Sequence, residues 1–150
     1  MIGSDNNSVG TLETLTTTLI DSVNGYRDAA QNAEGTKFQE IFRKNADERS
    51  RVAEELRAEI RRLGGNAPDD GSLLGATHQR FLDLKAAITG RDDTAIINEV
   101  ERGEDYLKEK FEAALNADTS PETRSIIERA YQSVRQGHDQ IRNLKRGLEA

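Results

Sequence analysis

One acidic residue, Glu104, stands out because it lies at the centre of the apolar face of a predicted helix. Val100, Leu107 and Phe111 recur at spacings of three and four residues around it, so all four side chains share one face. A carboxylate in that position must be ion-paired, hydrogen-bonded, protonated or bound to a metal, because an isolated buried charge is too costly. Glu104 is therefore the first candidate site residue.

Other polar side chains fall on the inner faces of the neighbouring predicted helices. His138 lies on the apolar side of the last helix, while Asn45 lies within the apolar stripe of the second helix and Glu48 near its edge. Carboxylates and imidazole are ligands that iron and manganese accept in helical bundles. Glu48, Glu104 and His138 therefore form a tentative mononuclear site for Fe or Mn.

A full dinuclear centre is not expected, because the ligand pattern is incomplete. Di-iron and di-manganese bundles take one Glu from each of two helices and a Glu-x-x-His pair from each of the other two. Here the corresponding pairs read Glu48-x-x-Arg51 and Arg135-x-x-His138, so a permanent cation replaces one ligand in each pair. An arginine beside the cavity repels a divalent ion and competes with it for the carboxylates.

The alternative to a metal is an interior network of ion pairs and hydrogen bonds. Counted outward from the turn near residues 116–121, Arg135 is nearly level with Glu101 in an antiparallel hairpin. Arg135 is therefore predicted to pair with Glu101 or Glu104. Tyr26 and Asn45 complete this predicted network, and the network and the mononuclear metal site remain open alternatives.

The segments that must position these residues are amphipathic helices, with no alternation typical of strands. Thr36 with Gln39 fits a capping box, Gly64-Gly65 is a helix stop, and Ser120-Pro121 is a helix start. The predicted helices follow a flexible tail of residues 1–10 and cover about 11–31, 36–63, 72–90, 92–115 and 121–148.

The order of these helices predicts the fold class. Two antiparallel helical hairpins are joined by residues 64–91, which contain the short fifth helix. One long crossover between two hairpins is the connectivity of ferritin-like bundles. We therefore expect an all-α, ferritin-like four-helix bundle that forms a single domain over residues 11–150.

Composition and charge limit the classes of partner and the cellular location that we expect. Lys and Arg total 21 against 27 Asp and Glu, and the resulting net charge of -6 disfavours nucleic acid as a partner. No apolar stretch approaches the roughly 20 residues of a membrane-spanning helix, and no signal peptide is evident, so a cytoplasmic location is expected. The 150 residues include no cysteine, which excludes disulfides and thiolate metal sites.

Small residues on a second face of the first predicted helix indicate a close contact with another helix or another subunit. Thr14, Thr18, Gly25 and Ala29 would let another backbone approach closely, either a neighbouring helix or another subunit. An exposed face of weak helix formers is the alternative interpretation. On the first interpretation we expect a homodimer.

Several short motifs resemble those of a bacterial family of ferritin-like four-helix-bundle proteins of unknown function. The resemblance runs from about residue 11 to 146. It rests on Gly25-Tyr26, Gly64-Gly65 before a Pro-containing loop, Gly90-Arg91-Asp92-Asp93 followed by Ala95-Ile96-Ile97, Glu101-Arg102-Gly103-Glu104 and His138-Asp139-Gln140-Ile141. The resemblance implies a ferritin-like fold but no particular activity.

Two functional hypotheses follow. The first is a non-enzymatic, oligomeric bundle that acts through protein contacts, in a stress or envelope-associated response, and that keeps a degenerate di-metal site. The second is a metal-binding ferritin-like oxidase or ferroxidase that uses Fe or Mn. The incomplete ligand set favours the first, whereas the inward direction of Glu48, Glu104 and His138 supports the second.

Overall fold

The four long helices that the sequence predicts are all present. The computed structural model describes residues 2–68 and 93–149, and in these ranges it contains four α-helices and no strand. The helices are α1 (Ile2–Asn32), α2 (Thr36–Arg62), α5 (Asp93–Leu115) and α6 (Pro121–Glu149). The predicted all-α class is confirmed. The predicted short helix over residues 72–90 lies outside the described residues.

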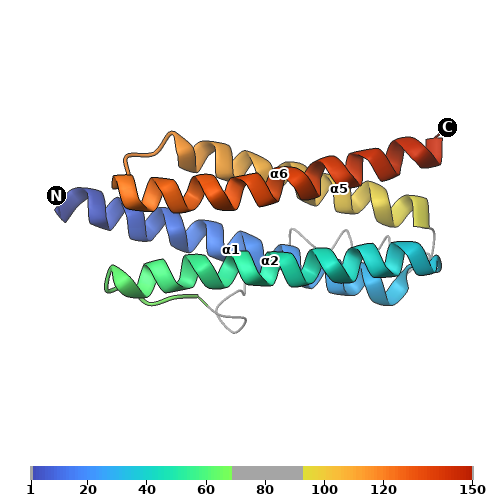
Figure 1. Cartoon of the computed structure of the whole chain (residues 1–150), viewed down its shortest axis with the longest axis horizontal. Coiled ribbons are helices and arrows are strands. Elements are labelled where there is room, and N and C mark those ends of the chain that lie inside the picture. Colours follow the sequence, from blue (N-terminus) through green and yellow to red (C-terminus); the bar gives the residue numbers. More distant parts are fainter. Residues whose placement is uncertain (1, 69–92, 150) are drawn as a thin grey trace.

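The helices pack side by side into an elongated bundle (Figure 1). α1 contacts α2 and α5 contacts α6, while α1 with α5 and α2 with α6 join the two pairs. The side chain of Asp93, the first residue of α5, accepts hydrogen bonds from the backbone N–H groups of Glu34 (2.8 Å) and Gly35 (3.0 Å). Because Gly35 is the N-cap of α2, helices α2 and α5 start at the same end of the bundle.

The helix ends follow the sequence signals in two of three cases. Gly64 adopts a positive φ of 84° after α2, and the N–H of Gly65 bonds to the carbonyl of Ile60 at 2.9 Å, as in a glycine-terminated helix. Ser120 Oγ accepts a hydrogen bond from the N–H of Thr123 at the start of α6. The predicted capping box at Thr36 is wrong, because the N-cap of α2 is Gly35 and makes no side-chain cap hydrogen bond.

Residues 2–10 lie in α1 in the structure, although the sequence predicts a flexible tail over residues 1–10. Ser8 is fully buried, and its hydroxyl oxygen accepts a hydrogen bond from the N–H of Ser120 at 3.1 Å. The contact ties the first turns of α1 to the turn between α5 and α6. Residue 11 is therefore not the start of the helix.

Two apolar clusters form the core, and each draws on all four helices. One cluster occupies the end of the bundle that holds Leu12, Leu56, Phe111 and Ile127. The other occupies the opposite end and includes Phe42. Buried polar side chains lie at the junction between the clusters, namely Ser22, Arg49, Glu104 and His138. The bundle therefore has a polar layer near its middle.

The small-residue face of α1 is mostly buried within the single chain. Thr18, Gly25 and Ala29 are buried, and Thr14 alone among the four residues of the predicted dimer contact is exposed. The surface predicted to hold a second subunit is therefore not free to do so. None of the described helices is long and apolar enough to cross a membrane.

Candidate functional site

Glu104 is the centre of the polar layer, and both of its carboxylate oxygens are occupied. Arg49 forms a bidentate ion pair with it, Nη1 to Oε1 and Nη2 to Oε2, both at 2.7 Å. The hydroxyl group of Tyr26 donates a further hydrogen bond to Oε1 at 2.7 Å. The Arg49 and Glu104 side chains are each only 2% exposed. The carboxylate is therefore ion-paired and hydrogen-bonded, two of the four states that its sequence position allowed.

Arg49 connects this carboxylate to the other helices. Its Nη1 donates to Ser22 Oγ on α1 at 2.9 Å, and its Nη2 lies 3.5 Å from the carbonyl oxygen of Val134 on α6. Its Cζ lies 5.6 Å from the centroid of the Tyr26 ring, a cation–π distance. Since Arg49 is on α2 and Glu104 on α5, the network joins all four helices.

Gly137 makes room for the guanidinium group. A Cβ atom built at this position would collide with Arg49 Nη2, and it would lie 3.6 Å from Glu104 Oε2. Glycine costs a helix interior about 1 kcal/mol relative to alanine. Its presence in the middle of α6 is explained by the close approach of Arg49 to the helix backbone.

The electrostatics fix the charge state of the network. Burial raises the pKa of Tyr26 well above its usual value, and the charge of Glu104 and its hydrogen bond raise it further. The positive charge of Arg49 lowers this pKa, but not enough to cancel the rise. Burial works to lower the pKa of Arg49, but the Glu104 carboxylate outweighs it and the pKa is raised. Tyr26 therefore stays a neutral hydrogen-bond donor and Arg49 stays a cation.

The predicted partner of Glu104 is wrong, because Arg135 does not enter the interior. Arg135 is exposed, with its Cζ 5.9 Å from the centroid of the Tyr131 ring, and Glu101 instead accepts a hydrogen bond from Lys145 Nζ at 2.8 Å. Counting residues along the hairpin places Arg135 at the right height. However, its neighbour Val134 takes the inward direction, and one residue turns the side chain by about 100°.

Arg49 is the functional residue that sequence reasoning missed, although the sequence carried a signal for it. Ala46, Val52, Ala53 and Leu56 are buried on α2, and Arg49 lies three or four residues from its nearest neighbours in this stripe. The helical spacing that identified Glu104 therefore identifies Arg49 as well.

The three predicted metal ligands have separate surroundings. Glu48 accepts hydrogen bonds from Arg51 at 2.7 and 3.0 Å and from Ser133 Oγ at 2.6 Å. The Arg51 hydrogen bonds lower the pKa of Glu48, although partial burial opposes them. His138 is buried, and its Nε2 lies 2.6 Å from Asp105 Oδ1.

Within residues 2–68 and 93–149, no group of three or more His, Asp or Glu side chains could hold a metal ion. The structure therefore does not bring Glu48, Glu104 and His138 together as one ligand set. Metal binding at these residues stays a prediction.

The other predicted members of the interior network are divided between the core and the surface of the bundle. Tyr26 belongs to the network around Glu104, whereas Glu101 and Arg135 do not. Asn45 is half-buried on α2, and its Nδ2 atom is buried without a hydrogen-bond partner. Chemically, the arrangement neutralises the buried Glu104 carboxylate with the buried Arg49 guanidinium group.

Comparison with known proteins gives a family but no activity. No curated protein matches the chain. The family described as Domain of unknown function (DUF2383) matches residues 7–117, which include Tyr26, Arg49 and Glu104 but not Gly137 or His138. Since this match covers well over half of the 150 residues, the chain belongs to the DUF2383 family.

Proposed function

We propose that the protein is a non-enzymatic, ferritin-like bundle that acts through protein contacts and in which an arginine takes the place of a metal. The connectivity supports the ferritin-like assignment. α2 and α5 start at the same end of the bundle, so the end of α2 at Arg62 and the start of α5 at Asp93 lie at opposite ends, as a crossover connection requires. Two hairpins joined by one such crossover are typical of ferritin-like folds.

The observation that carries the proposal is the position of Arg49. Its guanidinium group occupies both oxygens of Glu104, the one inward glutamate near the middle of α5, from a distance of 2.7 Å. A divalent ion at Glu104 would have to displace this cation or lie beside it, which electrostatic repulsion opposes. The residues present therefore do not fit the dinuclear centre of metal-binding bundles.

Metal-dependent thermal unfolding tests this proposal. The melting temperature of the wild type should not rise when Mn²⁺ or Fe²⁺ is added, because only a ligand that binds the folded state stabilises it. A rise that is lost in Glu104→Gln, but kept in the control Glu101→Gln one turn away on α5, would contradict the proposal. That result would favour the alternative, a ferritin-like oxidase or ferroxidase.

The proposal also includes a homodimer in the cytoplasm, with no nucleic acid bound. The net charge of -6 supports the last point. Because Thr18, Gly25 and Ala29 are buried in the single chain, a dimer has to use another surface. Light scattering that gives only a particle of 16.7 kDa would rule the dimer out.

A further inference from the structure

The polar layer lies where two helical hairpins meet. α1 and α2 form the first hairpin and α5 and α6 the second, and the hairpins meet where α1 contacts α5 and where α2 contacts α6. Residues 18–23 of α1 are all buried, and at about 100° per residue these positions cover every side of the helix. A small rotation of the first hairpin would therefore exchange one buried side chain for another, so burial alone does not select one arrangement.

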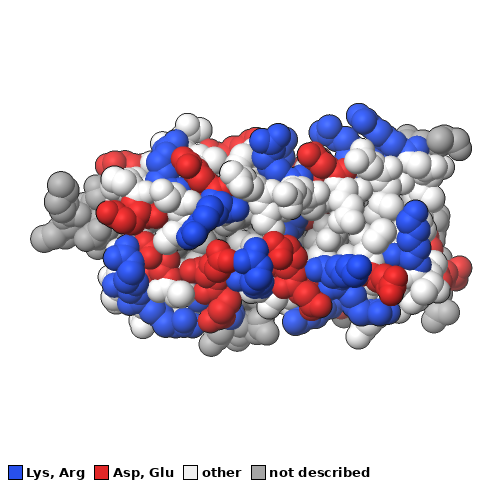
Figure 2. All heavy atoms as spheres, in the orientation of Figure 1, with Lys and Arg blue, Asp and Glu red and all other residues white. Residues whose placement is uncertain are grey.

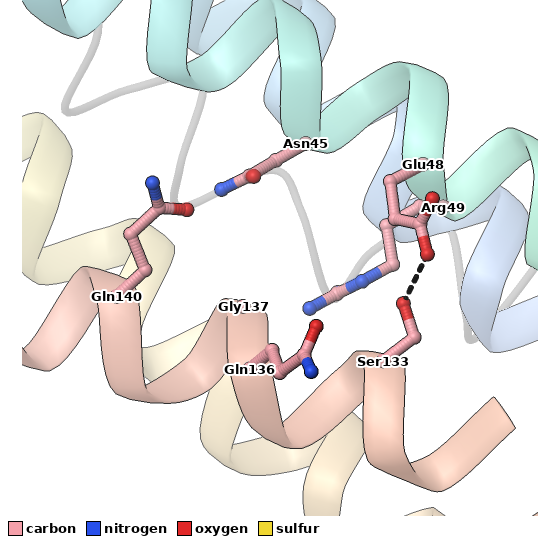
Figure 3. A pocket seen from close by; sticks show the side chains of 7 residues that line it. All are labelled: Asn45, Glu48, Arg49, Ser133, Gln136, Gly137 and Gln140. Carbon is pink, nitrogen blue, oxygen red and sulfur yellow. Dashed lines mark hydrogen bonds between the residues drawn. The ribbon is translucent and has the colours of Figure 1, made fainter. Parts of the chain in front are cut away.

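The ion pair between Arg49 and Glu104 requires one particular arrangement. The guanidinium group is planar and places two of its N–H groups on the two oxygens of Glu104, both at 2.7 Å. Figure 3 shows the Arg49 side chain extending from α2 toward Gly137 of α6, where the absence of a side chain leaves room for it. A shift of one hairpin against the other would break the paired contact and would place a bulkier α6 residue where Gly137 now lies.

Tyr26 and Val134 extend this directional contact to the other two helices. The Tyr26 hydroxyl of α1 donates to Glu104 Oε1 at 2.7 Å, and the Val134 carbonyl oxygen of α6 lies 3.5 Å from Arg49 Nη2. Both helices of the first hairpin are thereby linked to the second. A displaced arrangement would leave buried polar groups unpaired, which costs more than an exchange of apolar neighbours.

Surface ion pairs of the bundle provide a comparison. Figure 2 shows charged side chains of both signs mixed over the second half of α2. There Arg51 pairs with Glu48 and Glu55 of the same helix, and elsewhere Lys145 of α6 pairs with Glu101 of α5 within the second hairpin. Each of these pairs lies within one hairpin, so it does not depend on how the two hairpins meet.

A buried ion pair is a weak source of stability, because the cost of removing two charges from water offsets most of their attraction. Apolar side chains of similar volume in its place often leave a protein as stable as before or more stable. Cores repacked in this way lose their unique arrangement before they lose stability.

We propose that the polar layer aligns the two hairpins. The Arg49–Glu104 pair, together with Ser22 and Tyr26, selects one arrangement of the first hairpin against the second, and it does so without making the bundle more stable than an apolar layer would. This role does not depend on which partner the bundle contacts.

Pulsed electron paramagnetic resonance between two spin labels tests the alignment. The 150 residues contain no cysteine, so labels attach only at the introduced positions. Ser50→Cys on α2 and Asn98→Cys on α5, both exposed, report the distance between the hairpins. Asn24→Cys with Ser50→Cys reports a distance within the first hairpin. In the otherwise wild-type protein, both label pairs should give a single narrow distance distribution.

An apolar-layer variant carries the test. It combines Ser22→Ala, Tyr26→Phe, Arg49→Met and Glu104→Leu. Its midpoint of urea unfolding should equal or exceed that of the wild type, yet the distance distribution between the hairpins should broaden or become bimodal. The distribution within the first hairpin should stay narrow. A second version with Arg49→Leu and Glu104→Met guards against the poor fit of one side chain.

Thr123→Val is the matched control. Thr123 also joins the hairpins through a buried hydrogen bond, to Glu59 Oε2 at 3.0 Å, but it lies near the turn between α5 and α6. This variant should keep the narrow distribution between the hairpins. The proposal is overturned by a narrow distribution in the apolar-layer variant, or by equal broadening in Thr123→Val. It is also overturned if both apolar versions have a lower urea midpoint than the wild type or fail to fold, because the layer would then be a source of stability.

Discussion

Removing Arg49 should destabilise the bundle far more than removing a neighbouring surface arginine. The Arg49→Met variant leaves Glu104, whose side chain is 2% exposed, without its counter-charge. Breaking a buried pair from one side costs about 3–5 kcal/mol, because the remaining charge stays buried and unpaired. Arg51→Met is the matched control, since Arg51 lies two residues away on α2 and pairs with Glu48 and Glu55 at the surface. Its loss should cost less than about 1 kcal/mol.

A double-mutant cycle shows whether the cost comes from the pair itself. The free energy of unfolding is measured by urea denaturation, followed by far-ultraviolet circular dichroism. Arg49→Met combined with Glu104→Gln should cost much less than the sum of the two single variants, because no unpaired charge is left behind. Additive single effects, or an Arg49→Met variant as stable as Arg51→Met, would refute the reasoning.

Three more predictions follow from the buried groups. Gly137→Ala should destabilise the protein, because the new Cβ forces Arg49 to move. Gly147→Ala is the control: no atom lies within 4 Å of its new Cβ, so the free energy of unfolding should rise by up to about 1 kcal/mol. Thermal unfolding of the two variants makes the comparison. Burial raises the pKa of Asp21 from 3.8 to about 7, so between these pH values the folded state holds a proton that the unfolded state releases. The free energy of unfolding should therefore fall by about 1.4 kcal/mol for each pH unit that the pH rises in this range. Urea titrations at several pH values should show a weaker pH dependence of stability for Asp21→Asn than for the wild type. Because burial also raises the pKa of Tyr26, the wild type should lose stability above pH 10 more steeply than Tyr26→Phe, and an equal loss would contradict the buried position of the hydroxyl group.

The sequence predicts the helices well because the signals that define them are local. Apolar residues three and four apart mark each buried face, and Gly64 marks the end of α2. The predicted cap at Thr36 fails because the N–H groups of Glu34 and Gly35 bond to Asp93, a residue from another helix. Ser8 is likewise included in the bundle through a contact with Ser120, which no local pattern predicts.

The candidate site is predictable in part. The inward position of Glu104 follows from its own helix, but the identity of its partner depends on how two helices are rotated against each other. Counting residues along the hairpin placed Arg135 at the correct height on α6 but predicted the wrong direction for its side chain. Arg49 lies in an apolar stripe just as Glu104 does, so a search for every charged residue in such stripes would have found both.

The most direct test of the central claim is a crystal structure of the protein grown with excess Mn²⁺, with anomalous scattering recorded to locate the metal. We expect planar density for the Arg49 guanidinium between Ser22 and Glu104, and no anomalous peak within reach of the Glu104 carboxylate. An anomalous peak bound to Glu104, with Arg49 displaced from it, would contradict the account.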